Sequence, residues 1–209
     1  MKLQDFRIMM LVLIGILFLS ISSVYAEAIV LQFGKNVEGK HYSNKKYGIK
    51  IQYPKEWEVF DRNTHSAVFK KLLAAKPPDK STDLICVLSC GKDWNNLNPL
   101  TMLIVQGLPD SSKDLSVEEL AKLMNQNLKQ VSIPQGINIV EYPNVIEVGS
   151  RKLMRYIGTG IAQGKEAKTV YYAFVKGAKL YMFSGVSDSA MFDSYNKTFE
   201  YVAGSIEVE

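Results

Sequence analysis

The chain has 209 residues, of which 47% are hydrophobic and 22% are charged. This composition excludes an intrinsically disordered chain, and the length suits one domain with a substantial core. The formal net charge of +4 is mild, and Lys and Arg are interleaved with Asp and Glu instead of forming the basic stripe of a nucleic-acid-binding protein. We therefore expect no nucleic-acid partner.

The N-terminus has the three parts of a secretory signal peptide: a positive start at Lys2 and Arg7, an apolar run at 8–21, and small residues up to Ala26. The apolar run of 14 residues is shorter than the roughly 20 that a spanning helix needs. We predict that residues 1–26 are a signal peptide cleaved after Ala26, with cleavage after Ala28 and a retained membrane anchor as alternatives. The mature protein would be periplasmic or extracellular.

The first part of the mature chain predicts an exposed segment followed by strands. Residues 27–46 are poorly patterned and indicate an exposed lead-in, after which the domain would occupy 47–209. Apolar and polar residues alternate over 47–53, the pattern of a half-buried strand, and Pro54 ends it. Val68 and Phe69 indicate a second strand.

A hairpin and a helix follow. Residues 84–89 and 100–106 are apolar strand candidates on either side of a polar loop, so they predict a hairpin. Ser116 followed by Glu119 is the capping-box pattern that begins a helix. Apolar residues then recur at helical spacing until Pro134, which stops the helix.

The C-terminal part predicts further strands and a second helix. Strands are expected at 137–141, 152–161, 168–176 and 179–183, the last two joined by a tight turn at Gly177-Ala178. A helix is expected to begin near Ser187 or Asp188, with an apolar stripe for core packing. The stripe consists of Met191, Phe192, Tyr195, Phe199, Val202 and Ile206. Hairpin connections predict a mostly antiparallel sheet flanked by helices, an α+β domain of the α/β/α sandwich type.

Two cysteines, Cys86 and Cys90, lie four residues apart in a predicted strand. That spacing places them about 13 Å apart, whereas a disulfide needs Cα atoms roughly 4.4–6.8 Å apart. A local disulfide would require a sharp bend. Two free thiols, a local disulfide and a metal or redox pair all remain open, although the spacing is not that of a C-x-x-C redox motif.

Candidate catalytic residues are scarce. The two histidines are His41, in the lead-in, and His65, the single plausible general base. No serine lies in a G-x-S-x-G elbow, and neither a phosphate-binding loop nor metal-ligand spacing occurs in the sequence. We therefore expect no catalytic, cofactor-binding or metal-binding residues.

Two stretches of the sequence carry a family resemblance. The first is residues 47–57, a strand that ends in Tyr-Pro and is followed by a tryptophan. The second consists of Ala173-Phe174-Val175, Lys179-Leu180-Tyr181, Gly185, Phe192, Tyr195, Phe199 and Ser205-Ile206. Together they resemble the PsbP family and its wider PsbP/Mog1-like fold, an antiparallel sheet sandwiched by helices. The N-terminus is similar to a bacterial secretory signal and not to a Ser-rich, acid-poor transit peptide, so it departs from the photosystem members of the family.

The resemblance implies an accessory function. Plant and cyanobacterial members of this family are extrinsic subunits of photosystem II, so the expected function is that of a noncatalytic exported protein. We expect it to dock on a membrane-associated or envelope complex through an unidentified protein partner. A small-ligand or metal-binding domain, with Trp94 of the polar loop as a ligand contact, is the alternative. A hydrolase that uses His65 is a third hypothesis.

Overall fold

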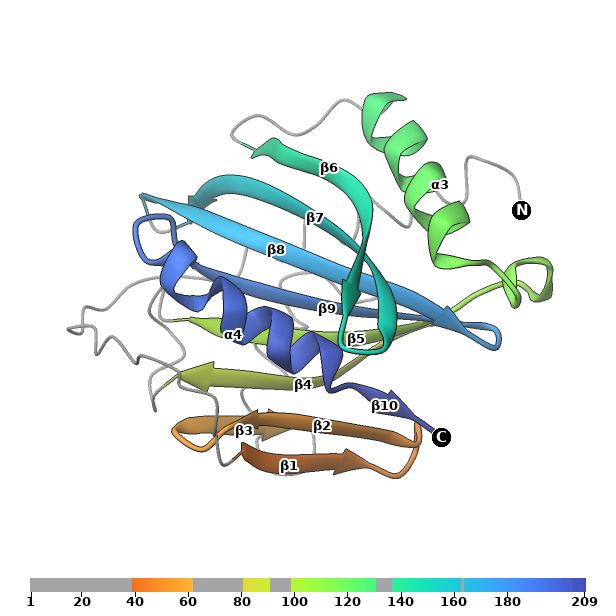
Figure 1. Cartoon of the computed structure of the whole chain (residues 1–209), viewed down its shortest axis with the longest axis horizontal. Coiled ribbons are helices and arrows are strands. Elements are labelled where there is room, and N and C mark those ends of the chain that lie inside the picture. The colour runs from red at the N-terminus through yellow and green to blue at the C-terminus, as the bar shows by residue number, and fades with distance from the viewer. Residues whose placement is uncertain (1–38, 62–80, 91–98, 131–136, 163) are drawn as a thin grey trace.

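The fold is a layered α+β domain built on a seven-stranded sheet (Figure 1). The computed structural model describes residues 39–61, 81–90, 99–130, 137–162 and 164–209. The strand order is β3-β4-β5-β9-β8-β7-β6, and neighbouring strands are antiparallel throughout. The strands are β3 (Trp57–Asp61), β4 (Thr82–Cys90), β5 (Leu100–Gly107), β6 (Ile137–Val148), β7 (Arg151–Ala162), β8 (Lys165–Lys176) and β9 (Lys179–Asp188).

A small sheet of order β1-β2-β10 lies beside the large one (Figure 1). Its central strand β2 (Ile49–Pro54) has the predicted alternation and ends at the predicted proline. The outer strands are β1 (Gly39–Asn44) and β10 (Glu207–Val208), both antiparallel to β2. The described end of the lead-in expected at 27–46 is therefore a paired strand, because β2 supplies ladder hydrogen bonds that a sequence pattern does not reveal.

Two helices cover opposite faces of the large sheet. Helix α3 (Val117–Gln130) packs on β6, β7 and β8, and α4 (Phe192–Gly204) packs on β8, β9 and β2. Each helix buries its apolar stripe in a separate core cluster, one on each face of the sheet. The predicted antiparallel sheet sandwiched by helices is confirmed. Neither helix has the length and apolar character needed to cross a bilayer, and no other helix of the described residues has them.

Helix α3 begins as its sequence predicts. The Glu119 backbone N–H donates to Ser116 Oγ at 3.2 Å, and the Ser116 backbone N–H donates to Glu119 Oε2 at 2.9 Å. These reciprocal bonds satisfy two amide groups that the first helical turn leaves without intrahelical partners. A single-turn 3-10 helix at Asp110–Ser112 precedes α3.

Helix α4 begins later than predicted. The expected start near Ser187 or Asp188 is wrong, because β9 continues to Asp188 and pairs with β8 along its whole length. Asp188 then forms the turn into the helix: its side chain accepts the Ala190 N–H at 2.9 Å and its carbonyl accepts the Met191 N–H at 3.0 Å. The predicted apolar stripe of α4 is confirmed.

The hairpin predictions are confirmed, with longer strands. β4 pairs with β5, and β8 pairs with β9 across a turn in which Gly177 has φ of +59°, a conformation that favours glycine. The strand expected at 137–141 runs to Val148 instead. It passes Pro143 because β6 is an edge strand, where a residue without an N–H costs no ladder bond. The strand predicted at Val68 and Phe69 lies outside the described residues.

Candidate functional site

The turn between β1 and β2 carries one side of a surface cleft. Gly48 has φ of +62° and lets the chain reverse there. The Asn44 side-chain oxygen accepts the Tyr47 backbone N–H at 3.3 Å, and the Glu209 N–H donates to the Gly48 carbonyl at 2.9 Å. The C-terminus and a side-chain bond thus fix the turn that presents Lys46 and Tyr47.

The cleft lies between this turn, the end of β3 and the start of β4. Its volume is about 400 Å³, which falls within the range of small-molecule sites. The lining residues are Tyr42, Ser43, Asn44, Lys45, Lys46, Tyr47, Asp61, Asp83, Leu84 and Ile85. Segments from three parts of the chain therefore meet there.

Two phenol–carboxylate pairs form the polar wall of the cleft. The Tyr47 hydroxyl donates to Asp83 Oδ2, and the Tyr42 hydroxyl is hydrogen-bonded to Asp61. Burial raises the pKa of Tyr42 to about 12, and the negative charge of Asp61 adds to this rise. Burial and the bond to Asp83 also raise the pKa of Tyr47. Both phenols therefore remain protonated donors at neutral pH.

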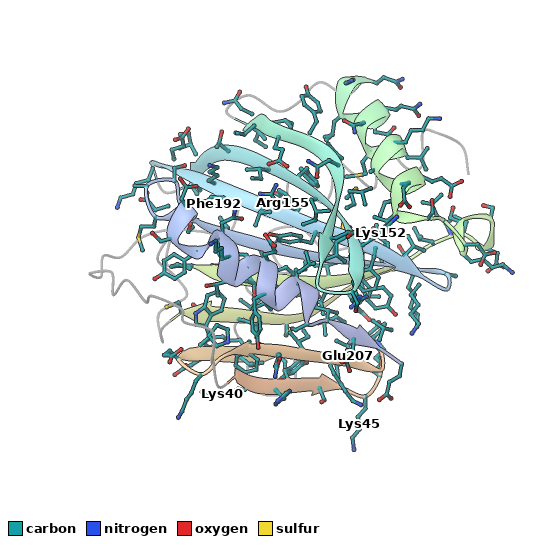
Figure 2. The ribbon with its side chains drawn as sticks, in the orientation of Figure 1. Lys40, Lys45, Lys152, Arg155, Phe192 and Glu207 are labelled. Carbon is teal, nitrogen blue, oxygen red and sulfur yellow. The ribbon has the colours of Figure 1, made fainter. Side chains whose placement is uncertain are left out.

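Two lysines bring positive charge to the same wall. Lys46 Nζ lies 2.8 Å from Asp83 Oδ2 and 4.8 Å from the centroid of the Tyr47 ring. Lys179 Nζ, from the first residue of β9, lies 5.3 Å from the same ring centroid. The Lys46 side chain is 68% exposed, so it reaches Asp83 from the mouth of the cleft. Lys45 also borders the cleft, but its side chain extends away from the sheet (Figure 2).

The other wall is apolar and comes from β4. Leu84 is half-buried and Ile85 is buried, and the β4–β5 register shifts between Leu84 and Cys86. This β-bulge places Ile85 and Cys86 in the same core cluster although they are adjacent in sequence. The cleft therefore combines an apolar side with a carboxylate and aromatic side.

In the cleft, the tyrosine hydroxyls do not titrate near neutral pH. Its carboxylates are held by phenols, and its phenols have pKa values far above neutral pH, whereas an efficient general acid or base titrates near the working pH. The Cys86 thiol is buried close to Asp61, and burial raises its pKa. A buried protonated thiol is a poor nucleophile.

The two cysteines are free and occupy different environments on β4. Cys86 is buried in the core beside the cleft, whereas Cys90 is half-buried at the opposite end of the strand and is hydrogen-bonded to Tyr195. Both lie in extended backbone, in which residues four apart are too distant to bridge. Among the described residues, no three His, Cys, Asp or Glu side chains gather as a metal site requires.

The remaining predicted candidates do not enter the cleft. His41 follows the strand alternation of β1 and lies on the face opposite Tyr42, so it is not a lining residue. His65 and Trp94 lie outside the described residues, as do residues 91–98 of the polar loop that carries Trp94. The cleft was not predicted from the sequence, because its lining residues are far apart in the chain.

Comparison with known proteins supports the fold. No family model and no curated protein matches the chain. Among solved structures, cyanobacterial PsbP from Synechocystis sp. PCC 6803 matches with a TM-score of 0.53 and 14% identity over 90% of this chain and 98% of that chain. A protein from Bacteroides thetaiotaomicron matches with a TM-score of 0.51 and 11% identity. That match covers 82% of this chain but 49% of the other, so this chain corresponds to about half of it. The fold is PsbP-like.

Proposed function

We propose that this protein is an exported, noncatalytic accessory protein that docks on a membrane-associated or envelope complex. The observation that carries the proposal is the hydrogen bonding and protonation of the side chains in the cleft. Its carboxylates and phenols are bonded to one another, and its phenols and nearest thiol remain protonated at neutral pH. This arrangement supports a role in recognising another molecule rather than in transferring protons.

Two further observations support the location and the class. Residues 1–26 have the pattern of a secretory signal. The PsbP-like fold is shared with a cyanobacterial PsbP, and the sequence resemblance at both ends of the domain points to the same family. These observations favour a binding role outside the cytoplasm.

Cell fractionation combined with crosslinking tests this proposal. The full chain with a C-terminal tag is expressed in its native cell, and the cells are treated with a membrane-impermeant crosslinker. We expect a processed chain in the extracytoplasmic fraction, crosslinked to the same envelope protein in repeated preparations. An unprocessed cytoplasmic chain, or a processed chain that never acquires a partner, contradicts the proposal.

Small-ligand binding is the second candidate function, and the cleft favours it. A cleft of about 400 Å³ is large enough for a small molecule. Tyr47 makes its hydroxyl bond inside this cleft, so a ligand there changes the tyrosine signals. Unchanged tyrosine resonances and melting temperature across a broad ligand panel would exclude this candidate.

A further inference from the structure

Lys46 occupies the position that a cationic ligand would take in the cleft. Its ammonium group contacts the Asp83 carboxylate at 2.8 Å and lies 4.8 Å from the Tyr47 ring centroid. A carboxylate beside an aromatic face is the usual environment of a bound ammonium or guanidinium group. Because the Lys46 side chain is 68% exposed, it is free to leave this position without exposing a buried surface.

The rest of the cleft suits the stem of such a cation. Leu84 and Ile85 provide an apolar side, and Asp61 lies on the polar side together with Asp83. Long cationic side chains place their methylene groups on apolar surface and their charge in a polar environment. The cleft offers both kinds of surface in one volume.

We propose that this cleft binds an alkylammonium or guanidinium group, and that Lys46 is a tethered competitor that occupies Asp83 until the ligand replaces it. The chemistry is shared by free amines and by Lys or Arg side chains of a protein partner. The inference goes beyond the proposed function and does not depend on it, because it is measured with the purified protein alone.

The competition by Lys46 is weak enough to be overcome. An exposed ion pair of this kind favours its bound state by at most about fivefold. An incoming ammonium group forms an equivalent bond to Asp83 and also brings a stem that contacts Leu84 and Ile85. An anion is opposed by the two carboxylates of Asp61 and Asp83, although Lys45 and Lys46 border the cleft and Lys179 lies against the Tyr47 ring.

NMR titration with cadaverine, a five-carbon diamine, tests the site, with 1-pentanol as the neutral analogue. We expect cadaverine to shift the ring signals of Tyr42 and Tyr47 and 1-pentanol to leave them unchanged. In the Lys46→Met variant, cadaverine should bind about two- to fivefold more tightly, because the competitor is gone. Lys45→Met is the matched control, since it removes the neighbouring charge but no bond to Asp83. At 0.15 M salt it should leave the affinity within about 1.5-fold of the original.

A second variant tests the carboxylate. Asp83→Asn keeps the side-chain shape and the acceptor for Tyr47 but removes the charge, and it should weaken cadaverine binding at least about tenfold. An unchanged melting temperature separates this loss from unfolding. Weaker cadaverine binding by Lys46→Met, or equal cadaverine affinities of the two lysine variants, would contradict the role of Lys46 as a competitor. The absence of any shift in both the original protein and Lys46→Met would overturn the site.

Two more probes define the ligand class. Inorganic phosphate should not shift the NMR signals of the Tyr47 ring. Phosphate binding that is lost in Lys46→Met would contradict the proposal and indicate an anion site instead. A peptide with a single lysine and with both termini blocked is compared with cadaverine. This comparison distinguishes a protein side chain from a free amine as the source of the cation. Tighter binding of the peptide supports a partner's side chain as the ligand, and tighter binding of the diamine supports a free amine.

Discussion

Helix α4 packs tightly against the large sheet at Gly185, and Gly185→Ala should destabilise the protein. A Cβ at this position would lie 2.3 Å from Phe199 Cγ. Carbon atoms pack at about 3.5 Å or more, so the ring would have to move by about 1.2 Å. Phe199 is fully buried and has Trp57, Phe192 and Tyr195 around it, which leaves the ring little room.

The expected magnitude follows from overpacking. Extra methyl groups in a well-packed core cost typically about 1–3 kcal/mol. With a urea m-value of about 2 kcal/mol/M, the unfolding midpoint should fall by roughly 0.5–1.5 M. The double variant Gly185→Ala/Phe199→Leu should lose less stability than the two single variants lose together. The smaller leucine side chain leaves the space that the new methyl group needs.

Gly107→Ala is the matched control for urea unfolding. Gly107 also lies in a strand of the large sheet, and the nearest atom to its Cβ would be the Ser81 carbonyl oxygen at 3.7 Å. The control should stay within about 0.5 kcal/mol of the original protein. If Gly185→Ala has the same midpoint as Gly107→Ala, then the packing of α4 on β9 is not as described.

Three further predictions concern the helix cap, the buried phenol and the thiols. Ser116→Ala removes the cap of α3 and should cost about 1 kcal/mol in urea unfolding, with an unchanged m-value. Burial raises the pKa of Tyr42 from 10.0 to about 12 in the folded protein. The contribution of the protonated phenol to the free energy of unfolding is therefore complete below pH 10 and is lost between pH 10 and 12. In Tyr42→Phe, the free energy of unfolding should fall less over that interval than in the original protein. Thiol titration of the unfolded, unreduced protein should find two thiols, and in the native protein Cys90 should react before Cys86. Finding no titratable thiol would reveal a disulfide between Cys86 and Cys90.

Local chemistry made several elements predictable from the sequence. The Ser116 and Glu119 side chains bond within one helical turn, so their spacing alone indicates the start of α3. Gly177 reverses the chain between two strands that pair with each other. In both places the partners are neighbours in sequence, and no distant residue had to be known.

Tertiary contacts set the features that the sequence did not reveal. The helical stripe predicts a helix start near Ser187, but Val186 and Ser187 join β9 because β8 offers ladder partners for both. Likewise, Pro143 is a stop signal in an isolated sequence but is accepted in β6 at the edge of the sheet. Propensity indicates where an element is possible, and the neighbouring strand determines its length.

The cleft is a stronger case of the same rule. Asp61 ends β3 and Asp83 is the second residue of β4, and separately they are ordinary polar residues near a loop boundary. They enter one cleft because β3 and β4 pair antiparallel, with Asp61 opposite Cys86. Tyr42 and Tyr47 join them because β1 pairs with β2 in a segment that has no clear pattern. Sequence spacing carries no signal for such a meeting.

The two kinds of bond in the cleft differ in how easily they are broken, and this difference is what a replaceable ligand requires. Tyr42 is half-buried and hydrogen-bonded to Asp61, so this pair is more protected from solvent than the Lys46 ammonium. The Lys46 ammonium is exposed, and an exposed ion pair adds little to stability. The frame of the site therefore persists when Lys46 leaves, and the Asp83 carboxylate then remains in place for another cation.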